Sequence, residues 1–181
     1  MKKRALIWMI AIGIVAAGTF GRAGFWAEST TTKHLTVVTS ASAGTVAPGA
    51  RVSLVVEIAP KPDMHVYAPG QKEFIPVSLT LAANDAIKAA TAQFPVAEKL
   101  EVKELGETHL VYTKPFRIVQ DVTIAKSAPV TRSDMGSSTI TVKGTLKYQA
   151  CDTSICYAPV SVPVTWTLAL QGDVPGGVKK R

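Results

Sequence analysis

The chain has 181 residues, of which 47% are hydrophobic and 18% are charged, with a net charge of +7 and two cysteines. A chain of this length can bury a hydrophobic core, and its small charged fraction argues against intrinsic disorder. Two cysteines cannot staple a fold of this size, which excludes a disulfide-rich miniature scaffold. No basic stripe interleaved with aromatic residues is present, so nucleic-acid binding has little support.

Residues 1–23 have the layout of a secretory signal peptide. Basic residues from Lys2 to Arg4 precede an apolar run from Ala5 to Phe20, and small residues follow. This run is shorter than the roughly 20 residues that cross a bilayer. We therefore expect cleavage after Ala23 and export to the periplasm or another extracytoplasmic space, with an uncleaved membrane tether as the alternative. In such an oxidising space the two cysteines should form either a disulfide or a redox pair.

The body of the chain shows the period-two alternation of half-buried β-strands. After a linker at 24–33, this pattern predicts one domain over 34–171, an all-β, immunoglobulin-like antiparallel β-sandwich, followed by a basic flexible tail at 172–181. Residues 85–92 could form one or two helical turns, and Pro163 suggests either an edge position for its strand or a backbone nitrogen that faces outward. The clearest strands are expected within 52–58, 116–124, 139–148 and 160–170, and weaker ones at 35–39, 77–81 and 110–112.

Cys151 and Cys156 lie between the two clearest strands, at one end of a predicted β-hairpin. A disulfide between them closes a very short loop and stabilises the fold by about 2 kcal/mol, against about 4.7 kcal/mol for a hundred-residue loop. Such a bridge is poorly placed as a staple and well placed as a reversible switch. From these residues alone, a redox pair and a local structural disulfide remain open alternatives.

The segment around the cysteines carries a family resemblance. Residues 147–159 (KYQACDTSICYAP) resemble the active-site hairpin of the N-terminal periplasmic domain of the thiol:disulfide interchange protein DsbD, with its Tyr-Gln-small-Cys and Cys-Tyr-Pro-Pro segments. Residues 63–67 look like the segment whose aromatic or His side chains line the cysteine site. Residues 104–106, followed by Tyr112, are similar to the family's cap loop. The resemblance spans roughly 35–170.

This resemblance implies an immunoglobulin-like domain that passes electrons by thiol–disulfide exchange. In the family, the reduced pair donates to partner disulfides outside the inner membrane, and a membrane-embedded relay with a thioredoxin-like domain recharges it. Carried over by position, Cys156 would form the mixed disulfide and Cys151 would resolve it. The implied partners are therefore a membrane-bound electron donor and an exported thiol–disulfide acceptor, with no cofactor and no metal.

The resemblance also implies residues that line or cap the cysteine site, namely His65, Tyr67, Leu105 and Tyr157. The sequence departs from the family at Ala158, where Pro is common. It also ends without the relay and the thioredoxin-like domain, so we expect the electron donor to act in trans.

Two other functions stay open at this point. The first is a secreted immunoglobulin-like binding module with a structural disulfide. The second is a copper protein, because blue-copper sites combine two histidines, a cysteine and a methionine in a β-sandwich. Against copper, such sites cluster these residues on one loop, and the cysteine loop holds neither His nor Met. The candidate ligands would be a cysteine with His34, His65 or His109 and Met64 or Met135.

The remaining candidate residues have ordinary structural interpretations. His34, at the linker edge, is expected to be solvated, and His109 is expected on a strand rim. Tyr148 and Trp166 alternate in phase with apolar neighbours, so both are expected in the core.

Overall fold

The computed structural model describes residues 28–102, 106–127, 131–132 and 138–171, and these residues contain strands and no helix. The strands are β1 (Glu28–Thr31), β2 (Leu35–Ala41), β3 (Thr45–Val46), β4 (Arg51–Pro60), β5 (His65–Tyr67), β6 (Ser78–Leu81), β7 (Ile87–Ala89), β8 (Glu98–Val102), β9 (Glu107–Tyr112), β10 (Phe116–Ile124), β11 (Thr131–Arg132), β12 (Ser138–Tyr148), β13 (Ala150–Cys151) and β14 (Val160–Leu170).

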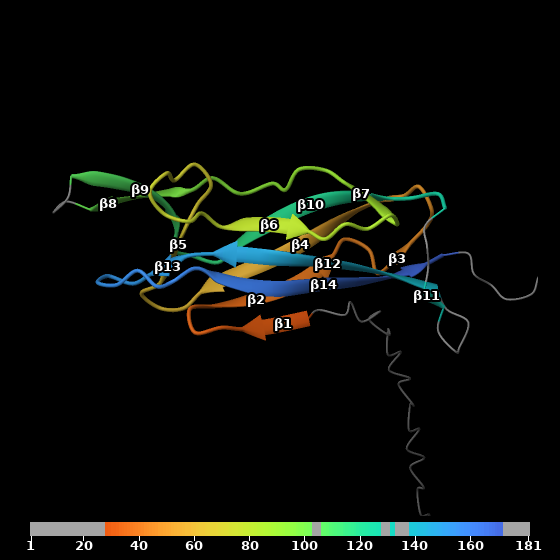
Figure 1. Cartoon of the computed structure of the whole chain (residues 1–181), viewed down its shortest axis with the longest axis horizontal. Helices are drawn as coiled ribbons and strands as arrows, with labels where there is room; N and C mark the ends of the chain where they lie inside the picture. Colours follow the sequence, from red (N-terminus) through yellow and green to blue (C-terminus); the bar gives the residue numbers. More distant parts are fainter. Residues whose placement is uncertain (1–27, 103–105, 128–130, 133–137, 172–181) are drawn as a thin grey trace, which may run out of the picture.

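Two sheets form the sandwich (Figure 1). One has the order β1-β2-β4-β10-β7, and the other has the order β11-β12-β14-β3 with β6 also paired to β12. All their pairings are antiparallel except the two-residue parallel contact of β3 with β14. The predicted immunoglobulin-like β-sandwich is confirmed.

Alternate residues of the strands fill the space between the two sheets, because successive side chains of a strand point to opposite faces. The buried residues of both sheets join in a single hydrophobic core. Both Tyr148 and Trp166 lie in it, as predicted. Its members include Val52, Leu54, Val56, Ile58 and Ile118 from one sheet and Ile140, Val142, Leu146, Val164 and Leu168 from the other.

A third, smaller sheet, with the order β13-β5-β9-β8, lies at one end of the sandwich, at the left in Figure 1. The long β12–β14 hairpin opens at the same end, where Tyr148 pairs with Val160. The chain between these two strands contains β13 and both cysteines. The fold therefore places the cysteine loop against β5, whose residues come from a distant part of the sequence.

Three local predictions can be compared with the structure. Glu28–Thr31, inside the expected linker, is strand β1 and pairs with β2. Residues 85–92 contain β7 instead of a helical turn, since Asn84 forms a turn by accepting the backbone N–H of Ala86 at 2.9 Å. Pro163 lies opposite Thr145 of β12, while β3 pairs with β14 only at 169–170. At Pro163 the side of β14 that faces away from β12 thus has no described strand partner. A proline fits this position because it has no N–H to donate to a neighbouring strand.

Several predictions fall outside the described residues: the signal at 1–23, the tail at 172–181, Leu105 and Met135. Within the described residues, no helix is long and apolar enough to cross a membrane.

Candidate redox site at the end of the sandwich

Cys151 and Cys156 form a disulfide, and their Cα atoms are 4.0 Å apart. Cys151 belongs to β13, pairs with His65 of β5, and is 1% exposed. Cys156 is exposed, because it follows a four-residue loop that leaves the sheet. The disulfide therefore joins a buried residue to an exposed one.

Asp152 organises the loop between the cysteines. Its Oδ1 accepts the backbone N–H groups of Ser154 and Ile155, both at 2.7 Å, and its Oδ2 accepts the hydroxyl of Tyr157 at 2.8 Å. These hydrogen bonds hold the pKa of the Asp152 carboxyl below its usual value, and the two from backbone N–H groups have the largest effect. Asp152 was not among the site residues predicted from the sequence. An Asp followed by small polar residues in a short loop is a turn signal that could have found it.

Tyr67 brings a hydroxyl to both sulfurs, at 3.2 Å from Cys151 Sγ and 3.5 Å from Cys156 Sγ. The hydroxyl is the donor, because the sulfurs of a disulfide carry no hydrogen. Its ring is buried and stacks on Phe74, with centroids 4.2 Å apart. Burial, and then the nearby Glu107 carboxylate, raise the pKa of Tyr67, so it remains a protonated donor.

His65 borders the same site. Its half-buried ring meets Tyr67 edge-on, with centroids 5.5 Å apart. Burial lowers the pKa of His65 and His109 lowers it further, while the Asp152 carboxylate opposes both effects. The net lowering favours a neutral imidazole at neutral pH. His65 and Tyr67, which the resemblance predicts to line the site, both border the cleft that contains the cysteines, and their part in exchange stays a prediction.

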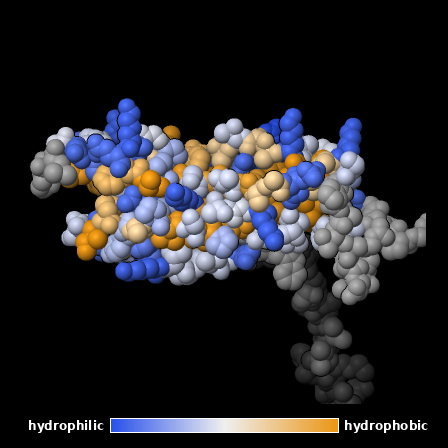
Figure 2. Space-filling model, viewed as in Figure 1, coloured by the Kyte–Doolittle hydropathy of each residue, from blue (hydrophilic) through white to orange (hydrophobic). Residues whose placement is uncertain are grey.

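A cleft of about 570 Å³ opens over the disulfide. Leu100 and Val102 of β8 form an apolar part of its wall, and Ile155, 57% exposed, lies at its rim. Figure 2 shows hydrophobic side chains gathered at this end of the molecule. The cleft also includes Met64, His109 and both cysteines.

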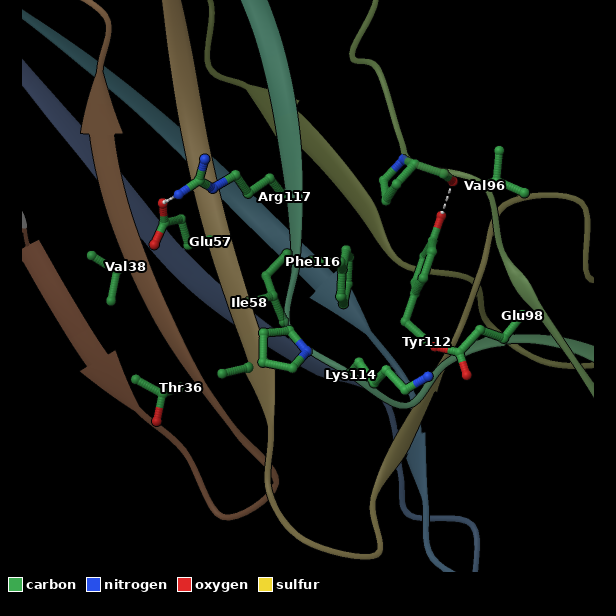
Figure 3. A pocket seen from close by; sticks show the side chains of 13 residues that line it. Thr36, Val38, Glu57, Ile58, Val96, Glu98, Tyr112, Lys114, Phe116 and Arg117 are labelled. Atoms are coloured by element: carbon green, nitrogen blue, oxygen red, sulfur yellow. Dashed lines mark hydrogen bonds and ion pairs between the residues drawn. The ribbon is translucent and has the colours of Figure 1, made fainter.

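A second groove, of about 690 Å³, lies between β2, β4 and the segment around Val96 (Figure 3). Glu57 and Arg117 form an ion pair across its floor at 2.6 Å, and the Tyr112 hydroxyl donates to the carbonyl of Pro95 at 2.7 Å. No cysteine or histidine lines this groove, so the larger hollow is not the redox site.

The prediction that His34 is solvated is wrong, because His34 is buried, with only 6% of its surface exposed. The Thr32 hydroxyl donates a hydrogen bond to the carbonyl of Leu35 and accepts one from the N–H of Leu35. This turn directs the side chain of His34 inward. Its ring lies 4.6 Å from that of Tyr157 and its Nδ1 lies 3.4 Å from the Tyr148 hydroxyl. Burial, with the nearby lysines, lowers the pKa of His34. Tyr157 therefore supports the loop from behind, between His34 and Asp152.

The donors of the copper alternative do not assemble in this disulfide form. His65, His109 and Met64 do line the cysteine cleft. Among the described residues, however, three possible metal ligands come within 4.8 Å of one another only at Glu73, Glu107 and His109. This group contains no cysteine, which a blue-copper site requires. His109, expected on a strand rim, is instead buried in β9.

Comparison with known families bears on the interpretations left open by the sequence. Residues 32–166 match the family described as thiol:disulfide interchange protein DsbD, N-terminal. The chain belongs to this family. The match covers most of the sandwich, from Thr32 to Trp166, including the cysteine loop, and so confirms the resemblance read from the sequence.

Two solved structures resemble this member of the DsbD N-terminal family. The DsbD N-terminal domain of Neisseria meningitidis in the reduced form is 17% identical, with 66% of this chain and 82% of that chain covered and a TM-score of 0.41. The N-terminal periplasmic domain of ScsB from Proteus mirabilis is 14% identical, with 77% of this chain and 49% of that chain covered and a TM-score of 0.47. A comparison with curated proteins found no match. Membership in the family therefore rests on the sequence match.

Proposed function

We propose that this domain carries reducing equivalents by thiol–disulfide exchange through Cys151 and Cys156. The observation that carries the proposal is the asymmetry of the pair, in which a solvent-facing Cys156 is bonded to a Cys151 that is 1% exposed. Cys156, as the exposed residue of the pair, is the one that an incoming partner meets first. Membership in a family named for thiol:disulfide interchange supports the same function.

The exchange proceeds through a mixed disulfide. The Cys156 thiolate of the reduced domain attacks one sulfur of a partner disulfide, and the partner's other sulfur leaves as a thiolate. The Cys151 thiolate then attacks Cys156 Sγ and releases the partner's first sulfur. Two electrons have moved to the partner, which takes up protons to form its dithiol, and the domain is left with its Cys151–Cys156 bond. The exposure of Cys156 supports this order of attack.

The lining residues act on the sulfurs from two sides. Tyr67 directs its hydroxyl at both sulfur atoms, which favours the sulfur that carries negative charge during exchange. His65 places a neutral imidazole beside the pair, and Tyr157 braces the loop through Asp152. The role of Leu105 as a shield over the pair stays a prediction, because this residue lies outside the described part of the chain.

The domain acts outside the cytoplasm, on other redox proteins. The basic and apolar layout of residues 1–23 supports a signal peptide cleaved after Ala23, and a cycling disulfide suits the periplasm. Its electron donor is a membrane-bound protein, and its acceptor is an exported protein with a thiol–disulfide pair.

A direct transfer experiment tests this function. The domain is reduced with dithiothreitol, and the dithiothreitol is then removed. The reduced domain is mixed with a strongly oxidising thioredoxin-fold protein, whose disulfide accepts electrons from exchange proteins with reduction potentials between about −180 and −270 mV. After acid quenching and alkylation, mass spectrometry should find two new partner thiols for each domain that regains its disulfide. A variant with both cysteines changed to serine gives the background. If the wild-type domain stays reduced and the partner stays oxidised as in that background, thiol–disulfide exchange through this pair is contradicted.

A further inference from the structure

A second cluster of chemically capable side chains lies next to the redox cleft. Glu73, Glu107 and His109 each offer one ligand atom, and these atoms lie within 4.8 Å of one another. The three residues line a hollow of about 280 Å³. His109 also lines the cysteine cleft, so the two hollows share a wall.

Two of the three side chains are fixed by strand β9. Glu107 and His109 are two residues apart, and therefore point to the same face of the strand. His109 Nε2 lies 2.9 Å from Glu107 Oε2. The histidine is 6% exposed and its ring packs edge-on against Phe74, with centroids 5.2 Å apart. This imidazole is held in one orientation before any ligand arrives.

The loop after β5 brings the third side chain to the same place. The N–H of Ala68 donates to the carbonyl of Leu110 at 2.8 Å, and the N–H of Leu110 donates to Gln71 Oε1 at 3.0 Å. Gly70 adopts a φ of +98°, which lets the chain turn closely over the Leu110 side chain. The stacking of Phe74 on Tyr67 anchors the far side of this loop. Glu73 is thus held beside β9 from both directions.

The chemistry of these donors suits a particular class of ion. An imidazole nitrogen with two carboxylates is a set that Zn²⁺ accepts, and three protein ligands plus water is the usual arrangement of an open zinc site. Donors around one tetrahedral ion lie roughly 3.3 Å apart, a separation that the exposed Glu73 side chain can reach by rotation. A divalent ion would also neutralise the two neighbouring carboxylates.

We propose that Glu73, Glu107 and His109 form a binding site for a divalent transition-metal ion of the zinc class. The proposed ligands are side chains other than the two cysteines. It rests on donors from two segments, the loop after β5 and strand β9, that the fold brings together.

Titration of the oxidised protein with Zn²⁺ in a calorimeter tests this site, because cysteines held in a disulfide offer no thiolate to the metal. We expect one ion per chain, with binding at least tenfold weaker in Glu73→Gln, Glu107→Gln and His109→Gln. Glu73 is exposed, so its variant should fold even if the His109 variant does not. Asp85→Asn, which changes an exposed carboxylate elsewhere, is the matched control and should bind as the wild type does.

Three results would overturn the proposal. The first is the absence of saturable Zn²⁺ binding at one ion per chain. The second is an affinity for Zn²⁺ that does not change in Glu73→Gln. The third is an affinity that falls in His65→Ala but stays the same in Glu73→Gln. The last of these would place the ion in the cysteine cleft instead.

Discussion

Changing Cys156 to Ala is expected to reduce disulfide exchange to the background of a variant lacking both cysteines. The remaining Cys151 is 1% exposed, so its thiol cannot reach a partner disulfide. Changing Cys151 to Ala should have a different effect. The exposed Cys156 can still attack, but no second thiol resolves the product, and the mixed disulfide with the partner accumulates. Non-reducing electrophoresis and mass spectrometry of the trapped species measure both outcomes.

The two variants control for each other, since each removes one sulfur and leaves the sandwich intact. Accumulation of the mixed disulfide in Cys156→Ala instead of Cys151→Ala would reverse the order of attack. If neither variant forms a covalent complex with a partner disulfide, exchange through a mixed intermediate is contradicted.

Changing Trp166 to Ala is expected to lower the free energy of unfolding by about 3–5 kcal/mol. The Trp166 ring is almost fully buried between the sheets. Its indole N–H, on β14, donates to the carbonyls of Ser40 at 2.9 Å and Val55 at 3.3 Å, which belong to the opposite sheet. The change removes apolar packing and leaves a cavity, and it also removes a donor that links the two layers. Urea denaturation of the oxidised protein gives the difference.

Two comparisons make the stability result specific. Val96→Ala, at a side chain that is 96% exposed, should change the free energy of unfolding by no more than about 0.5 kcal/mol. Reducing the wild-type disulfide should cost about 2 kcal/mol, because the bridge closes such a short loop. A larger loss on reduction than in Trp166→Ala would mean that the disulfide holds the fold together, as the binding-module alternative requires.

Much of the fold follows from the sequence pattern. Strands β4, β10, β12 and β14 alternate largely between apolar and polar residues, with exceptions such as Gln120 on the buried face of β10, since one face of each strand packs on the core. The position of the cysteines in the hairpin followed from the two strongest of these strands. Short strands such as β1 and β7 carry too few residues for a period to show, and they form because a neighbouring strand offers its hydrogen bonds.

The site was harder to predict where its parts come from distant segments. The cysteines, His65 and Tyr67 were found through motifs, each contained in one stretch of chain. His34 was misjudged, because burial of a polar residue beside an expected linker depends on packing against Tyr157 from the far end of the sequence. Phe74 was missed for a similar reason, since its stacking on Tyr67 depends on the path of the loop between them.

The central claim is that the Cys151–Cys156 bond is made and broken as part of the function of the domain. Its reduction potential tests this most directly, measured by thiol trapping after equilibration in a series of glutathione or dithiothreitol buffers. We predict a value between about −180 and −270 mV, the range of known exchange proteins. A value well below about −300 mV, typical of structural bridges in secreted proteins, would contradict the account.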